Sequence, residues 1–466
     1  MTTTFHVESQ SEPIFAFADP AHLLKNFRNA WENFNFELPA KIVEKYNLPS
    51  NKVDYGVVRK LVEFQEKHME PDMRIAPKLS PNHLDLKNKS SQAKMAVPPA
   101  QSLISRDTAT AIRFLIKYHN FDPNGETTAF VIETYARWYE IVQCRKFVLA
   151  FTSDSDKNAL LVMDLEKAKE VICSMKMASS KGEGQHPNQK GLALTTINVI
   201  KVAYLLLEKG LEHVPLGYVC SSDAIENFFS GLRGRNPSPT SVQCQRGIRV
   251  ISFCQIKTAK HGNCLDDSAD GDDTGWLQQL DALHAMVSNE PEEVDFDYRD
   301  FPIRDFASEN ALCSALGVVL RRTICSISHC PTCISALTGD GKSLLPHCLI
   351  EMKTSYSGGN EPIIYPSLVA YTMFVRIFEN YFLANWEKLK SPEAHDQFLC
   401  AVYEDLTTQY PDVPTCHLRM VLQRFLKFRT IFKAGGLNRQ VVESNKRRVR
   451  NDAQASKSMV GYYVNK

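Results

Sequence analysis

The chain has 466 residues, a formal net charge of +1 at pH 7 and 44% hydrophobic residues. That length can hold two to four domains, and the near-neutral charge excludes nucleic-acid binding through an overall basic field. Its 13 cysteines are accompanied by no charged-then-apolar leader and no run long enough to suggest a membrane span. We therefore expect free buried thiols in a soluble, intracellular protein.

The first notable stretch is a short apolar run, residues 13–18, which is followed by Asp19 and Pro20. The run suits a buried strand, and the amphipathic residues 22–31 predict a helix. The pattern alone favours an N-cap at Asp19 with proline at the first helical position. An aspartate at the end of a rigid strand can also hold a metal ion, so both interpretations of Asp19 stay open.

The chain is organised around residues 218–235, which read YVCSSDAIENFFSGLRGR. Serines at the start of this stretch predict a helix N-cap. Asp223 and Glu226 are three residues apart, so their carboxylates share one face of the predicted helix. Acids in a first turn and aromatic residues on one face are also what an ordinary amphipathic helix uses.

Residues 223–233 (DAIENFFSGLR), the following NPSPTSVQCQ and the segment after Asp19 resemble signatures of P-element-type transposases, the group that includes THAP-domain transposases. The resemblance implies an RNase H-like core in which Asp19 is the second and Glu226 the last acid of an Asp-Asp-Glu site. Two Mg²⁺ ions held by such carboxylates stabilise the attacking and leaving oxygens in DNA cleavage and joining. Residues 1–12 offer no acid on a strand, so we expect an N-terminally truncated relative that lacks the first aspartate.

The long, mainly helical segment between these acids suits the insertion domain that binds guanine nucleotide in this family. The resemblance assigns five residues to that site: Lys94, Tyr139, Glu140, Gln143 and Asp223. Glutamate and glutamine stand where the family has aspartate and asparagine, and the extra methylene moves each polar group. The alternative is a helical scaffold in which Glu140 is a solvated surface acid.

The C-terminal third contains a single C-x-x-C pair, Cys330 and Cys333, which His347 and Cys348 could complete as a zinc site. One C-x-x-C is a weak signal, so buried thiols are favoured over zinc. Residues 349–382 resemble the segment that helps to hold transposon DNA in this family. The basic residues 445–450 suit phosphate contacts or nuclear import.

These features predict an α-rich α/β chain, with a partial RNase H-like core interrupted by a large helical, GTP-binding-type insertion and followed by a helical C-terminal region. The expected parts are the partial core (1–40), the insertion (41–214), the final core helix (215–260), an acidic linker (261–305) and the C-terminal domain with its basic tail (306–466). We expect a nuclear transposase relative that binds DNA, Mg²⁺ and guanine nucleotide and self-associates. The alternatives are a catalytically inactive, host-retained module that binds DNA or protein, and a stand-alone guanine-nucleotide-binding protein.

Overall fold

The computed structural model describes residues 4–5, 14–70, 73–84, 96–179, 182–184, 187–221, 229, 240–254, 294–302, 305–324, 326, 330–341, 346–355, 364–389, 392–434 and 436. Its segments divide into two compact units. Unit 1 comprises residues 1–62 and 78–272, and unit 2 comprises residues 63–77 and 273–466.

Unit 1 is built mainly from helices. They are α1 (Pro20–Asn33), α2 (Ala40–Lys45), the first part of α3 (Tyr55–His68), α5 (Val97–Leu103), α6 (Arg106–Tyr118), α7 (Gly125–Gln143), α8 (Ser155–Ser174), α9 (Pro187–Glu208) and α11 (Ser241–Cys254). Short 3₁₀ turns lie at η1 (Pro81–His83), η3 (Phe147–Leu149) and η4 (Leu216–Tyr218). The expectation of an α-rich chain is confirmed.

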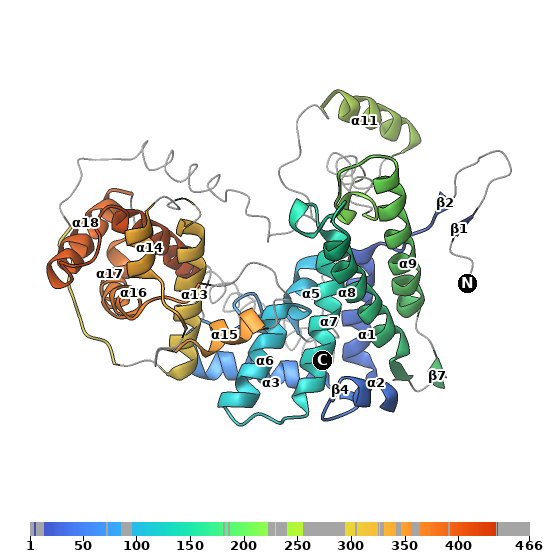
Figure 1. Ribbon diagram of the computed structural model, residues 1–466, viewed down its shortest axis with the longest axis horizontal. Helices are drawn as coiled ribbons and strands as arrows, with labels where there is room; N and C mark the ends of the chain where they lie inside the picture. Colours follow the sequence, from blue (N-terminus) through green and yellow to red (C-terminus); the bar gives the residue numbers. More distant parts are fainter. Residues whose placement is uncertain are drawn as a thin grey trace, which may run out of the picture. The chain divides into compact units, whose positions relative to one another are not determined.

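Helix α7 is central to the core of unit 1, where it packs against α1, α6 and α8 (Figure 1). The rings of Tyr135 and Trp138 on α7 are fully buried, and the Tyr135 ring lies 4.5 Å from that of Phe27 on α1. The Trp138 indole N–H donates to the Thr196 hydroxyl on α9 at 2.8 Å. The buried apolar face and the Trp138 hydrogen bond together fix the position of α7.

The strands of unit 1 are short, and every described pair is antiparallel. Strands β1 (Thr4–Phe5) and β2 (Ile14–Phe15) pair, as do β5 (Phe151–Thr152) and β8 (His213–Val214). A four-stranded sheet has the order β4 (Lys52–Val53), β3 (Asn35–Glu37), β6 (Lys176–Ser179), β7 (Gly182–Gly184). The RNase H-like core stays a prediction, because the described residues contain no larger mixed sheet.

The expected buried strand over residues 13–18 is shorter and more exposed than its composition predicted. Only Ile14 and Phe15 are extended in a pair, and Ile14 is 42% exposed. The following residues instead bond to α9. The Thr195 hydroxyl accepts from the Ala18 N–H and donates to its carbonyl, both at 2.9 Å.

Helix α9 is long and apolar enough to cross a membrane by length and composition alone, which differs from the expectation that no segment qualifies. Within unit 1, however, its polar side chains bond to neighbouring segments. The Gln189 amide donates to the carbonyls of Ile172 and Met175, and that of Asn198 donates to the Ala16 carbonyl. These bonds indicate a helix that packs inside the unit.

Unit 2 is helical in its described part. Its elements are α13 (Phe306–Ile324), α14 (Pro331–Leu337), α15 (Cys348–Ser355), α16 (Leu368–Tyr371), the π-helical η5 (Thr372–Phe378), α17 (Glu379–Asn385), η6 (Trp386–Lys388), α18 (Pro392–Gln409) and a helix over residues 418–434. Phe374, Phe378, Phe398 and Phe425 form the centre of its core.

A buried ion pair crosses this core. The Arg429 guanidinium makes two hydrogen bonds to the Glu379 carboxylate, and both side chains are at most 1% exposed. The guanidinium carbon also lies 5.1 Å from the centre of the Phe382 ring. Because neither charge can reach water, each depends on the other for compensation.

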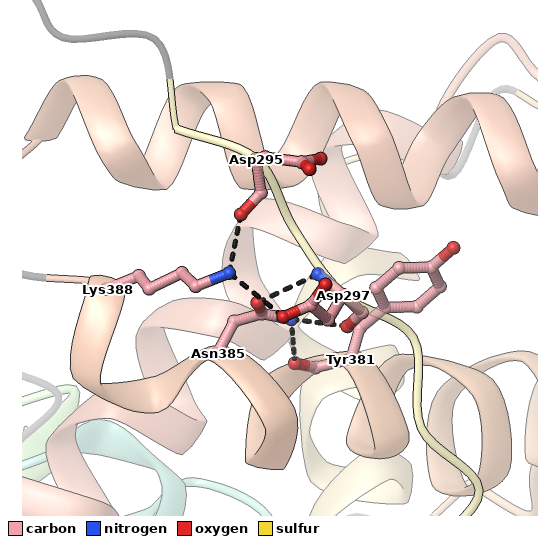
Figure 2. A network of polar contacts seen from close by, with 5 residues as sticks. All are labelled: Asp295, Asp297, Tyr381, Asn385 and Lys388. Carbon is pink, nitrogen blue, oxygen red and sulfur yellow. Dashed lines mark hydrogen bonds and ion pairs between the residues drawn. The ribbon is translucent and has the colours of Figure 1, made fainter.

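The end of the predicted acidic linker is part of unit 2. Figure 2 shows Asn385 bonded to this extended segment: its amide oxygen accepts from the Asp297 N–H at 3.0 Å, and its amide N–H donates to the Asp297 carbonyl at 2.7 Å. The Lys388 ammonium donates to the Asp295 carbonyl at 2.6 Å. Asp295 and Asp297, which lie within the acidic linker expected over residues 261–305, are therefore hydrogen-bonded to helical residues of unit 2.

Candidate functional site

The last turns of α7 carry three of the residues that the sequence assigned to a nucleotide site. Tyr139, Glu140 and Gln143 all lie there, and α7 ends where Cys144 adopts an extended backbone. Two other segments converge on this end of the helix, one from α5 and α6 and one from residues 216–220. We call this cluster the α7-end site.

The first segment reaches the site through Gln101 on α5. The Gln101 side-chain amide donates to the Tyr139 hydroxyl at 3.2 Å. Helix α5 begins at Val97, a few residues after Lys94, which itself lies outside the described residues. The segment that follows Lys94 and the end of α7 are thus brought together.

Two arginines surround Glu140. Its carboxylate forms an ion pair with Arg106, the first residue of α6, and the same carboxylate oxygen lies 3.8 Å from the Arg137 guanidinium. Arg137 also donates to Asp164 of α8 at 2.7 Å. Desolvation raises the pKa of Glu140, although both guanidinium groups act to lower it.

The alternative interpretation of Glu140 as a solvated surface acid stays a prediction, because its carboxylate is paired with arginine and is also partly exposed. Its side chain remains 39% exposed, so a ligand can still reach it. Hydrogen bonds between ions of this kind hold side chains in a defined orientation. Sequence reasoning missed Arg106, because only the fold brings α6 beside α7. It also missed Arg137, although its i,i+3 spacing from Glu140 on α7 was a signal for the pair.

The second segment docks closely on the end of α7. The Gly217 N–H donates to the Cys144 carbonyl at 2.9 Å, and a Cβ at Gly217 would lie 2.4 Å from the Gln143 carbonyl oxygen. The Cys220 thiol donates to the Val142 carbonyl at 3.2 Å. Only glycine permits this approach, so the chain leading to Asp223 passes beside Gln143.

An exposed aromatic ring lies at the edge of the site. Tyr218 is 70% exposed, and the Arg145 guanidinium carbon lies 5.7 Å from the centre of its ring. A flat ring beside a cation suits stacking with a planar ligand. Asp223 belongs to the predicted site, but it lies outside the described residues.

Asp19 takes the N-cap position of α1. Its carboxylate accepts from the His22 N–H at 2.9 Å, and Pro20 follows at the first helical position. The cap interpretation is therefore confirmed. Glu226 lies outside the described residues, so its approach to Asp19 and their joint metal binding stay a prediction.

In unit 2, the structure corrects the expected partners of the C-x-x-C pair. Cys330 and Cys333 lie together with Cys416 and His417. His347 instead packs its ring against Tyr365, with 5.2 Å between ring centres. The described cysteines are free thiols, as the sequence predicted.

Residues 21–153 match the family described as the TNP-like, GTP-binding insertion domain. The matched range includes Lys94, Tyr139, Glu140 and Gln143 and ends before Asp223.

A solved structure, the Drosophila P element transposase strand transfer complex, is similar to this chain at 21% sequence identity and a TM-score of 0.44. The similarity covers 55% of this chain and 55% of the solved chain. No match was found among the curated proteins.

Proposed function

We propose that this chain binds guanine nucleotide at the α7-end site. The observation that carries the proposal is the convergence of Tyr139, Glu140 and Gln143 with the flanking segments. These three residues lie in a range that matches a GTP-binding insertion domain. The proposal does not depend on the residues outside the described part of the chain.

The chemistry of the site suits a purine nucleotide. Guanine presents two adjacent N–H donors, and a carboxylate such as Glu140 accepts two hydrogen bonds side by side. The Tyr218 ring offers a stacking surface, and Arg145 beside it offers a cation for phosphate. The Arg106 pair orients the Glu140 carboxylate and leaves part of it exposed.

The proposal is tested by titrating the full chain with a fluorescent GTP analogue. Hydrogen bonds to a charged group contribute about 1.5–3 kcal/mol, so Glu140→Ala should weaken binding by about 10–150-fold. Glu166→Ala is a matched control, because Glu166 lies on α8, is 44% exposed and pairs locally with Lys169. Equal affinity of both variants, with both folded, would show that Glu140 only stabilises α6 against α7.

We further propose that the protein acts on DNA. Asp19 and Glu226 would hold Mg²⁺ for strand cleavage and transfer, with another acid supplied from outside the described chain. Arg419 and Lys427 are exposed on the helix over residues 418–434, whose other face is buried, so this helix would contact DNA phosphates. Nuclear localisation and self-association follow from the same proposal.

The second candidate function is a catalytically inactive module that binds DNA or protein. The cap at Asp19 favours it, because that carboxylate already has a structural role. Binding of duplex DNA that weakens steeply with salt, without Mg²⁺-dependent cleavage, would support this candidate. Cleavage that Asp19→Asn abolishes would exclude it.

A further inference from the structure

Four sulfur and nitrogen donors meet in unit 2, far from the α7-end site in sequence. Cys330 precedes α14 and Cys333 lies in its first turn, while Cys416 and His417 lie in the turn before the helix over residues 418–434. One donor atom from each of the four residues lies within 4.8 Å of all the others.

The separations between these atoms match those around a tetrahedral ion. Zn–S bonds of about 2.3 Å and Zn–N bonds of about 2.0–2.1 Å place two sulfurs about 3.8 Å apart and a sulfur and a nitrogen about 3.5 Å apart. The Cys330 and Cys416 sulfurs are 3.7 Å apart, and Cys333 Sγ is 3.4 Å from His417 Nδ1. Cys333 and Cys416 sulfurs lie closer, at 3.1 Å, which is still well beyond a disulfide bond of about 2.05 Å.

The donor set selects the kind of metal. Three thiolates and an imidazole favour Zn²⁺ over Mg²⁺ or Ca²⁺, which prefer oxygen ligands.

We propose that Cys330, Cys333, Cys416 and His417 bind one structural Zn²⁺ ion. Four protein donors fill a tetrahedral shell and leave no open position for substrate, which is the pattern of a structural site. The ion joins the start of α14 to the start of the helix over residues 418–434. The site lies wholly in unit 2 and does not rest on the proposed nucleotide or DNA function.

Hydrogen bonds near the proposed site show which elements the zinc ion would help to hold together. Arg424, from the helix over residues 418–434, donates to the Arg322 carbonyl at 2.8 Å and to the Ser326 hydroxyl at 3.0 Å. These bonds attach the same helix to the end of α13. Zinc binding therefore fixes the beginning of a helix whose first turns also contact α13.

The test is metal analysis of the full chain purified under reducing conditions without added chelator. We expect about one equivalent of zinc per chain, because the donor set is complete. Cys333→Ser and His417→Ala should each lower the zinc content at least about tenfold. Cys400→Ser is the matched control, since Cys400 is an exposed thiol outside the four donors, and it should keep the full equivalent.

A second measurement covers the case in which the cysteine variants do not fold. Replacing zinc by Co²⁺ in the unmodified chain should give the visible absorption of tetrahedral cobalt with thiolate charge-transfer bands. The proposal is overturned if the folded chain holds less than about a tenth of an equivalent of zinc and shows no such cobalt spectrum. It is also overturned if mass spectrometry finds Cys333 and Cys416 joined as a disulfide in the reduced preparation, because a disulfide cannot bind the ion.

Discussion

Substitutions of Asp19 can distinguish its structural role as a helix cap from its proposed role as a metal ligand. The structure uses one carboxylate oxygen to cap α1, through the His22 N–H at 2.9 Å. Asparagine retains a side-chain oxygen at that position and removes the charge, whereas alanine removes both. We predict that Asp19→Asn keeps the stability of unit 1 and that Asp19→Ala does not.

The size of the effect follows from the cap. Replacing a capping aspartate by alanine costs about 0.5–2 kcal/mol, and asparagine caps about as well as aspartate. At about 2–4 °C per kcal/mol for a unit of this size, Asp19→Ala should lower the midpoint of thermal unfolding by several degrees. Differential scanning calorimetry of the unmodified full chain and of each variant measures this midpoint.

The effect of Mg²⁺ on the unfolding midpoint then distinguishes the two proposed functions. If Asp19 also holds the ion, Mg²⁺ raises the unfolding midpoint of the unmodified chain but not that of Asp19→Asn. Asp154→Asn is the control, because Asp154 caps α8 in the same unit by accepting from the Asp156 and Lys157 N–H groups; this variant should keep the response to Mg²⁺. An Asp19→Asn variant as unstable as Asp19→Ala would refute the reasoning about the cap.

Two further predictions concern packing. Glu379→Gln should destabilise unit 2 by about 3–5 kcal/mol in a denaturant titration, because it removes the carboxylate charge that pairs with buried Arg429. The double variant Glu379→Leu/Arg429→Met should recover most of that loss; no recovery would contradict the argument. Gly217→Ala should cost about 1–3 kcal/mol and weaken GTP binding, since the new Cβ would lie 2.4 Å from the Gln143 carbonyl oxygen. An unchanged affinity would show that this close approach is not needed by the site.

The sequence analysis grouped the residues of the proposed nucleotide site that lie within one helix. Tyr139, Glu140 and Gln143 are neighbours on α7, so their helical spacing and the family resemblance were sufficient to group them. Arg106 could not be assigned in the same way, because its pairing with Glu140 depends on how α6 packs against α7. Similarly, the close approach of Gly217 to the end of α7 depends on tertiary structure.

The proposed zinc site also shows that sequence proximity alone does not identify all the residues of a site. The C-x-x-C pair predicted Cys330 and Cys333 as candidate ligands, and proximity in sequence suggested His347 and Cys348 as their partners. The fold instead brings Cys416 and His417 to them from a turn that follows α18. The Asp19 cap was predictable because an N-cap and the proline after it are local to the chain.

Hydrogen exchange of the full chain with and without GTP tests the central claim most directly. Binding at the α7-end site should slow exchange in the last turns of α7, in α5 and in residues 216–220, and ATP at the same concentration should have a much smaller effect. Slower exchange confined to other segments, or equal protection by GTP and ATP, would contradict a guanine-nucleotide site at the end of α7.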